Sequence, residues 1–256
     1  MIYSENNIVW GGPGLLLERG FMKTEHVSDR MNRIAARFFF YILGICTIAL
    51  GLTLSTKTNF GASAVIAVAF TISELTGLKL GDATFYFYFL FIVAQIILHL
   101  LPGKRAPYDR KKALIIDVLQ LPFSLVFTRL LNFYASWIPV PETLAVRVLV
   151  LVVSVIVIGV GAALTLDMRL VPSPADGIVQ TISDRSGLEL GLTKNIVDIS
   201  CVVLNCAVAL IFAHHTIGIG IGTLAGMIGT GRVIAAFNKL FGAYLMPLGL
   251  PEEVPK

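Results

Sequence analysis

The chain has 256 residues and a formal net charge of +4, with 56% hydrophobic and 14% charged residues. Soluble domains average about 25% charged residues, so this composition excludes a soluble protein and indicates an integral membrane protein. The three cysteines lie inside apolar runs without the spacing of a metal site, and we interpret them as small packing residues.

The chain begins with a polar stretch, residues 1–36, which we predict to be a loop-like cytoplasmic tail. The sequence leaves open whether translation starts at Met1 or at Met22. The uncharged run that follows, Phe38 to Thr56, is 19 residues long. The apolar core of a signal peptide has only about 7 to 15 residues, so this run predicts a retained membrane span.

Six segments approach the length of about 20 mostly apolar residues that a spanning helix needs. They are Phe38 to Thr56, Ala83 to Leu101, Ala113 to Tyr134, Val148 to Leu166, Asn195 to Ala213 and Ile217 to Leu240. Two further segments, Ala62 to Thr76 and Pro174 to Ser186, would cover only about 20 Å as helices. We expect them to be re-entrant, which is tolerated where protein or a wet cavity surrounds the backbone.

The chain contains an internal repeat with a constant offset of 110 residues. Residues 71–81 (TISELTGLKLG) and 181–191 (TISDRSGLELG) are identical at seven of eleven positions. The register extends without a gap back to Arg37 in the first copy and Arg147 in the second. A repeat of this size determines the architecture, so we predict two related membrane units.

The basic residues predict how these units are oriented. With the amino terminus inside, cytoplasmic segments hold fourteen of the twenty lysines and arginines, five of them between Pro102 and Lys112. This is the positive-inside pattern. Three crossings per repeat is an odd number, so the second repeat must run upside down relative to the first.

The sequence thus predicts an all-α integral membrane protein with six transmembrane helices in two inverted three-helix repeats, each with a short re-entrant helix. The repeats are residues 37–140 and 147–242, and residues 243–256 form a cytoplasmic tail. Inverted repeats recur in secondary transporters, which bind their substrate near the midplane at the repeat interface.

Ionisable residues inside the spans are the sharpest functional candidates, because charge at the bilayer centre is costly. They are Asp117, Arg129, Lys194, Asp198 and Arg232. Lys194 and Asp198 lie four residues apart and share a helix face, so they could simply neutralise each other. Asp117 and Arg129 lie near span ends and could extend to the interface. Asp198 and Arg232 lie deepest and are the preferred candidates for substrate or coupling roles.

Uncharged polar residues form a second set, Gln95, Gln120, Asn132 and Asn205. They either line a pathway or, more simply, hydrogen-bond between helices. The histidines at span ends are expected to be interfacial, namely His99, His214 and His215. Small residues spaced by four predict close helix packing, namely Gly218, Gly222 and Gly226, Gly51 with Ser55, and Gly161 with Thr165.

The two short segments begin with residues that favour helix starts. Ser173 precedes a proline and is followed by Asp176, and Ser63 occupies the same place in the first copy. The amino ends of helices attract anions through free backbone N–H groups. These starts are therefore either parts of a binding site or ordinary caps.

Five runs resemble the YczE-like branch of the YitT family of bacterial membrane proteins. They are RFFFYILG (37–44), LGL (50–52), KTNFGAS (57–63), TGLKLG (76–81) and GIGIGT (218–223), and the resemblance extends over residues 36–245. It implies a polytopic protein of the bacterial inner membrane without an established family site. The family usually shows Ser-Pro-Trp-Asp after the first Gly-Ala, whereas Ala64 follows Ser63 here, so only Asp176 in the second copy keeps this acid.

The leading hypothesis is a plasma-membrane transporter or permease with both termini cytoplasmic. Its site for a small molecule or ion would lie between the repeats, at Asp117, Gln120, Asp176, Lys194, Asp198, Asn205 and Arg232, with Ser63 and Ser173 at the short-helix starts. We see no enzyme signature, and we expect no cofactor, metal or nucleic-acid partner, only membrane lipids. The alternative is a scaffold or assembly factor that docks a cytosolic protein through the basic loop Lys104 to Lys112.

Overall fold

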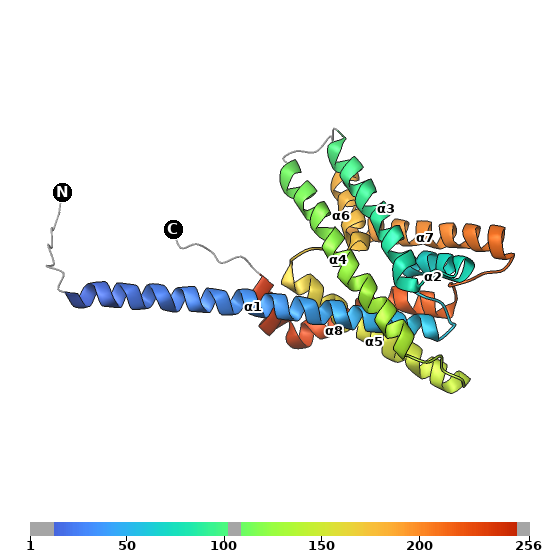
Figure 1. Cartoon of the computed structure of the whole chain (residues 1–256), viewed down its shortest axis with the longest axis horizontal. Helices are drawn as coiled ribbons and strands as arrows, with labels where there is room; N and C mark the ends of the chain where they lie inside the picture. Colours follow the sequence, from blue (N-terminus) through green and yellow to red (C-terminus); the bar gives the residue numbers. More distant parts are fainter. Residues whose placement is uncertain (1–12, 102–108, 250–256) are drawn as a thin grey trace.

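The computed structural model describes residues 13–101 and 109–249, with residues 13–30, 246, 247 and 249 described by their backbone alone. The chain forms eight helices over these ranges (Figure 1), namely α1 (Pro13–Lys57), α2 (Ala64–Thr76), α3 (Leu80–Leu100), α4 (Arg110–Trp137), α5 (Leu144–Met168), α6 (Pro174–Ser186), α7 (Leu190–Ala213) and α8 (Ile221–Gly249). Among the described residues, five stretches are long and apolar enough to cross a membrane, namely Met31–Lys57 of α1 and helices α3, α4, α5 and α7. The prediction of an all-α, multi-pass membrane protein is confirmed.

The amino-terminal stretch differs from the prediction. Residues 13–36, expected to be loop-like, are helical and continue without a break into the first span, so that α1 projects well beyond the other helices (Figure 1). Polarity misled the prediction, because Leu, Glu, Lys, Arg and Met are good helix formers whatever their charge. Residues 1–12 lie outside the described residues.

The last predicted span starts later than expected. Its first residues, 217–220, form a turn in which Gly218 has φ +75°, and α8 begins at Ile221. With 29 residues α8 is long enough to cross a membrane, but it is not among the five stretches that are also apolar enough. A sixth crossing therefore stays a prediction.

The two short segments are helices of the same length with the same ends. Each has 13 residues and begins directly after Ser63 or Ser173. Each ends at a glycine in the left-handed region, Gly77 with φ 72° and Gly187 with φ 75°, which is the usual C-terminal cap. Three residues later the next helix begins, so the repeated TIS…GLxLG motif encodes a helix end and a tight turn.

Helices α1 and α5 cross through glycines in a two-fold arrangement. A Cβ on Gly51 would lie 2.7 Å from Ile158, and a Cβ on Gly161 would lie 2.8 Å from Ile48. Ile158 and Ile48 are themselves 110 residues apart, so each contact is the repeat image of the other. Gly44, which precedes Gly51 on α1, lies against Thr165, which follows Ile158 on α5. The contacts run in opposite directions on the two helices, so α1 and α5 are antiparallel.

Each short helix packs against a long helix of the other half. Helix α2 packs along α7, and α6 packs along α3 (Figure 1). Seven residues of α2 are buried, which makes it a core element despite its length. The halves differ in their last helix, because α4 packs along α3 whereas α8 packs mainly along α5.

Candidate functional site

The start of α6 meets a buried pair of amides from α3 and α4. Gln95 and Gln120 are each 1% exposed, and each side chain donates a hydrogen bond to the other at 3.0 Å. Gln95 Nε2 also lies 3.3 Å from the Pro174 carbonyl oxygen. Because a buried amide without partners is costly, this reciprocal arrangement fixes how α3, α4 and α6 meet.

Gly177 allows α6 to approach this amide pair. A Cβ at Gly177 would lie 2.5 Å from Gln95 Oε1 and 2.6 Å from Gln120 Nε2, closer than a side chain can sit. The first turn of α6 therefore packs with its backbone against the two amides. The two amides of α3 and α4, in the first half of the chain, thus contact the start of α6, in the second half.

His99 and Asp117 form an ionisable pair next to the amides. His99 Nδ1 lies 2.6 Å from Asp117 Oδ2, and the two residues are 5% and 1% exposed. Both lie within candidate spans, where ionisable groups are rare and usually functional. Both side chains are buried against protein rather than exposed on the helix surface, and their depth in the membrane stays a prediction. A buried imidazole and carboxylate in contact can hold and pass a proton.

Charged groups from α6 and α7 lie near the same helix start. Ser173 Oγ donates to Asp176 Oδ2 at 2.7 Å and accepts from the Asp176 backbone N–H at 3.2 Å, which caps α6. The exposed Asp176 acts electrostatically on Asp198. Asp198 is 8% exposed, and its Oδ2 lies 3.8 Å from Lys194 Nζ. The predicted pairing of Lys194 with Asp198 is confirmed, and α6 begins among acidic groups.

Asn205 ties the α7–α8 connection to α2. Its Nδ2 donates to the Ile217 carbonyl oxygen at 2.7 Å, and Thr71 Oγ1 of α2 donates to the same oxygen at 3.1 Å. Asn205 is the repeat counterpart of Gln95, but the structure gives it this structural contact. Ser63 stands at the start of α2 without a capping side-chain bond.

Arg232 does not join these groups. It is exposed on α8, although its central position in the predicted span suggested a deep, functional placement. Burial depends on which face of the helix a residue occupies, and the sequence of α8 does not define that face. Arg129 is exposed on α4, and its Nη1 lies 3.1 Å from Asp82 Oδ1 at the start of α3.

A second buried polar cluster was not predicted. Asp167, in the last turn of α5, accepts a hydrogen bond at 3.3 Å from Asn238 of α8. Beside it, Arg37 Nη2 donates to the Met168 carbonyl oxygen at 2.9 Å. Asp167 was overlooked because the fourth predicted span ended at Leu166, whereas α5 continues to Met168. A longer hydropathy window would have placed this acid inside the helix.

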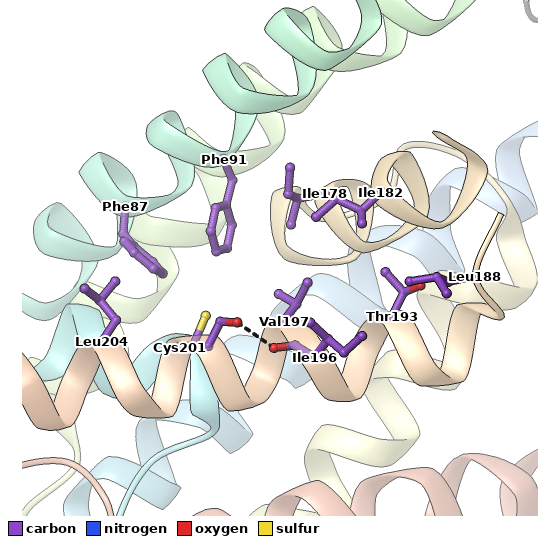
Figure 2. Close-up of a pocket in the computed structure, with 11 residues that line it drawn as sticks. Phe87, Phe91, Ile178, Ile182, Leu188, Thr193, Ile196, Val197, Cys201 and Leu204 are labelled. Carbon is purple, nitrogen blue, oxygen red and sulfur yellow. Dashed lines mark hydrogen bonds between the residues drawn. The ribbon is translucent and has the colours of Figure 1, made fainter. Parts of the chain in front are cut away.

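An apolar groove lies between α3, α6 and α7 (Figure 2). Its volume is about 310 Å³, and Phe87, Phe91, Ile178 and Ile182 point into it together with apolar residues of α7. The only polar side chains that line it are those of Thr193 and Ser200, apart from the thiol of Cys201. The groove is therefore almost entirely apolar.

These features define the class of the protein as an all-helical, multi-pass membrane protein with ionisable residues buried among its helices. The chain belongs to a family of unknown function (DUF6198), whose model matches residues 35–239. No curated protein and no solved structure matches the chain.

The amide pair should behave as a unit in a double-mutant cycle. Gln95→Leu or Gln120→Leu alone leaves the other amide buried without its partner, and we expect each to cost about 1 to 3 kcal/mol. The double variant should cost less than the sum of the two. Thermal unfolding in detergent measures this, with Gln180→Leu on the exposed face of α6 as the control. Strictly additive losses would contradict a mutual pair.

Proposed function

We propose that the protein is a transporter or permease for a small solute in the bacterial plasma membrane. In this proposal its two halves cross the membrane in opposite directions, α8 is the sixth crossing, and both termini are cytoplasmic. The antiparallel, two-fold crossing of α1 and α5 supports the opposite directions. The repeat offset of 110 residues in the short helices supports two related halves.

The short helices α2 and α6 would enter the membrane without crossing it. Each has 13 residues, which corresponds to about 20 Å of helix against a hydrocarbon core of about 30 Å. Backbone ends at that depth are tolerated only inside protein or beside a wet cavity. The packing of each short helix against a helix of the other half satisfies this requirement.

One observation carries the proposal: the start of α6 meets buried polar groups of the opposite half. Gln95 and Gln120 contact its first turn, and the buried His99–Asp117 pair lies one turn away on α3 and α4. A site with these groups offers hydrogen bonds to a solute, and the His99–Asp117 pair can hold a proton beside it. Asp176 and Asp198 would complete it from α6 and α7.

Transport in proteoliposomes tests this function. Vesicles that contain the purified protein are incubated with a defined mixture of amino acids, organic acids, amines and sugars, and their contents are measured by mass spectrometry. We expect at least one solute to enter faster than it enters protein-free vesicles. Asp117→Asn and Gln120→Leu should slow that uptake about tenfold or more, which corresponds to about 1.4 kcal/mol in the barrier.

The matched control is Gly226→Ala, because a Cβ there meets nothing within 4 Å. This variant should retain the wild-type uptake rate. Uptake no faster than in protein-free vesicles for every solute in the mixture would overturn the proposal, as would equal uptake by the wild type and both site variants.

A further inference from the structure

The contact between Asp167 and Asn238 is incomplete. Asn238 Nδ2 donates to Asp167 Oδ1 at 3.3 Å, and Asp167 is 7% exposed. The second oxygen of Asp167 and the side-chain oxygen of Asn238 are both buried and have no hydrogen-bond partner among the described residues. Two unpartnered acceptors on two side chains already in contact require an explanation, since buried polar atoms are nearly always paired.

The amide pair at α6 indicates what is missing. Gln95 and Gln120 satisfy each other because each amide offers one donor and one acceptor to its partner. An ionised carboxylate offers acceptors only, so an ionised Asp167 has nothing to donate to Asn238. A protonated carboxyl has one O–H donor, and it would complete the same two-bond pattern with the amide.

We propose that Asp167 is a proton-binding site, in which the carboxyl is protonated while it pairs with Asn238. A proton from the aqueous phase binds the free carboxylate oxygen of Asp167. The resulting O–H donates to the side-chain oxygen of Asn238, and the proton returns to water on release. No other bond changes. Its role as the coupling site for transport rests on the proposed function, whereas the protonation itself does not.

Arg37 holds the backbone of the same turn. Its Nη2 donates to the carbonyl of Met168, the residue after Asp167, and its Nε is buried without a partner among the described residues. The last turn of α5 is therefore tied to α1 through a backbone carbonyl and to α8 through the Asp167 carboxyl. Proton release would remove the O–H bond to Asn238 and so weaken the contact of α5 with α8.

The other charged groups around Asp167 lie at the rim of this cluster. Arg169, the exposed cap of α5, acts on it electrostatically. On α8 the neighbouring Lys239 is exposed, and on α1 Arg33 lies one turn before Arg37 and has a contact of its own. Arg169 carries a positive charge that opposes the proton, so the site is one from which a proton can leave.

Infrared difference spectroscopy of the protein in lipid tests the protonation directly. The wild type should show a carbonyl-stretch band of a protonated carboxylic acid between about pH 5 and pH 8, where an ordinary aspartate is ionised. Asp167→Asn should remove that band, and Asn238→Leu should shift it because the hydrogen bond is lost. Asp117→Asn and Asp198→Asn are the matched controls, since they leave this band in place.

Thermal unfolding provides a second readout. In Asp167→Asn the new amide carries an N–H donor at every pH, which can donate to the side-chain oxygen of Asn238. This variant should therefore be at least as stable as the wild type, and its melting temperature should vary less with pH. A protonated carboxyl stabilises less as pH rises, so the wild type should lose stability over the same range.

Two results would overturn the proposal. The first is the absence of any carboxylic-acid band that Asp167→Asn removes. The second is a strong loss of stability in Asp167→Asn, which would indicate that a negative charge is required at this position. If the wild type carries no solute, the proposed function fails while the infrared result still decides the proton site. If solute is carried, Asp167→Asn should abolish its dependence on a pH gradient.

Discussion

Gly81→Ala should prevent α3 and α4 from packing at their present distance. A Cβ at Gly81 would lie 2.0 Å from the backbone oxygen of Thr128 and 2.7 Å from Asn132 Oδ1. The oxygen belongs to a helix backbone and cannot rotate away, so the helices must separate. Separation also weakens the 2.7 Å hydrogen bond from the Gly81 N–H to Asn132. We expect a loss of about 3 kcal/mol or more.

The repeat supplies a matched control for this substitution. Gly191 occupies the same place at the start of α7, and a Cβ there meets nothing within 4 Å. Gly191→Ala should be neutral or should stabilise by up to about 1 kcal/mol, because Ala is the better helix former. Thermal unfolding of both variants in detergent makes the comparison. Equal behaviour of the two would mean that the α3–α4 crossing does not depend on Gly81.

The short helices could be predicted almost to the residue because their signals are local. Ser63 and Ser173 start them, and Gly77 and Gly187 end them with a left-handed cap that other residues adopt at a cost. Long-helix ends were less accurate, because apolar composition changes gradually and the polar residues that flank a span are still good helix formers. The amino-terminal part of α1 was missed for this reason.

The polar pairs between α3 and α4 could be predicted only from the way these two helices align with each other. These helices are antiparallel neighbours, so a step toward the connecting loop on α3 is matched by a step toward it on α4. Gln95 faces Gln120, and one turn nearer the loop His99 faces Asp117. Sequence alone named Gln120 and Asp117 without partners, since each residue was considered within its own span. Aligning the two helices across their connecting loop would have predicted both pairs.

Arg232 illustrates a limit that no local signal removes. Depth along a helix follows from sequence position, whereas exposure depends on which face packs against a neighbour. The early part of α8 carries glycines on several faces, and Gly226 and Gly231 contact nothing while Gly222 and Gly229 are packed. No apolar stripe therefore indicated where Arg232 would point. Only the packing of α8 along α5 decides it.

Breaking the His99–Asp117 pair on one side should be among the most damaging changes in the protein. His99→Leu leaves a carboxyl that is 1% exposed without its imidazole partner, 2.6 Å away in the native protein. Removing one member of a buried pair costs about 3 to 5 kcal/mol, whereas replacing both with apolar residues is often nearly neutral. The double variant His99→Leu/Asp117→Leu should therefore unfold at a higher temperature than His99→Leu alone.

The Arg129–Asp82 pair is the internal control for this cycle. It joins the same two helices, but its side chains are 67% and 33% exposed, and exposed pairs contribute about 0 to 1 kcal/mol. Arg129→Leu should lower the melting temperature only slightly, and adding Asp82→Leu should produce little coupling. If His99→Leu were as mild as Arg129→Leu, water would have to reach Asp117, and the His99–Asp117 pair would not act as a dry, buried ion pair.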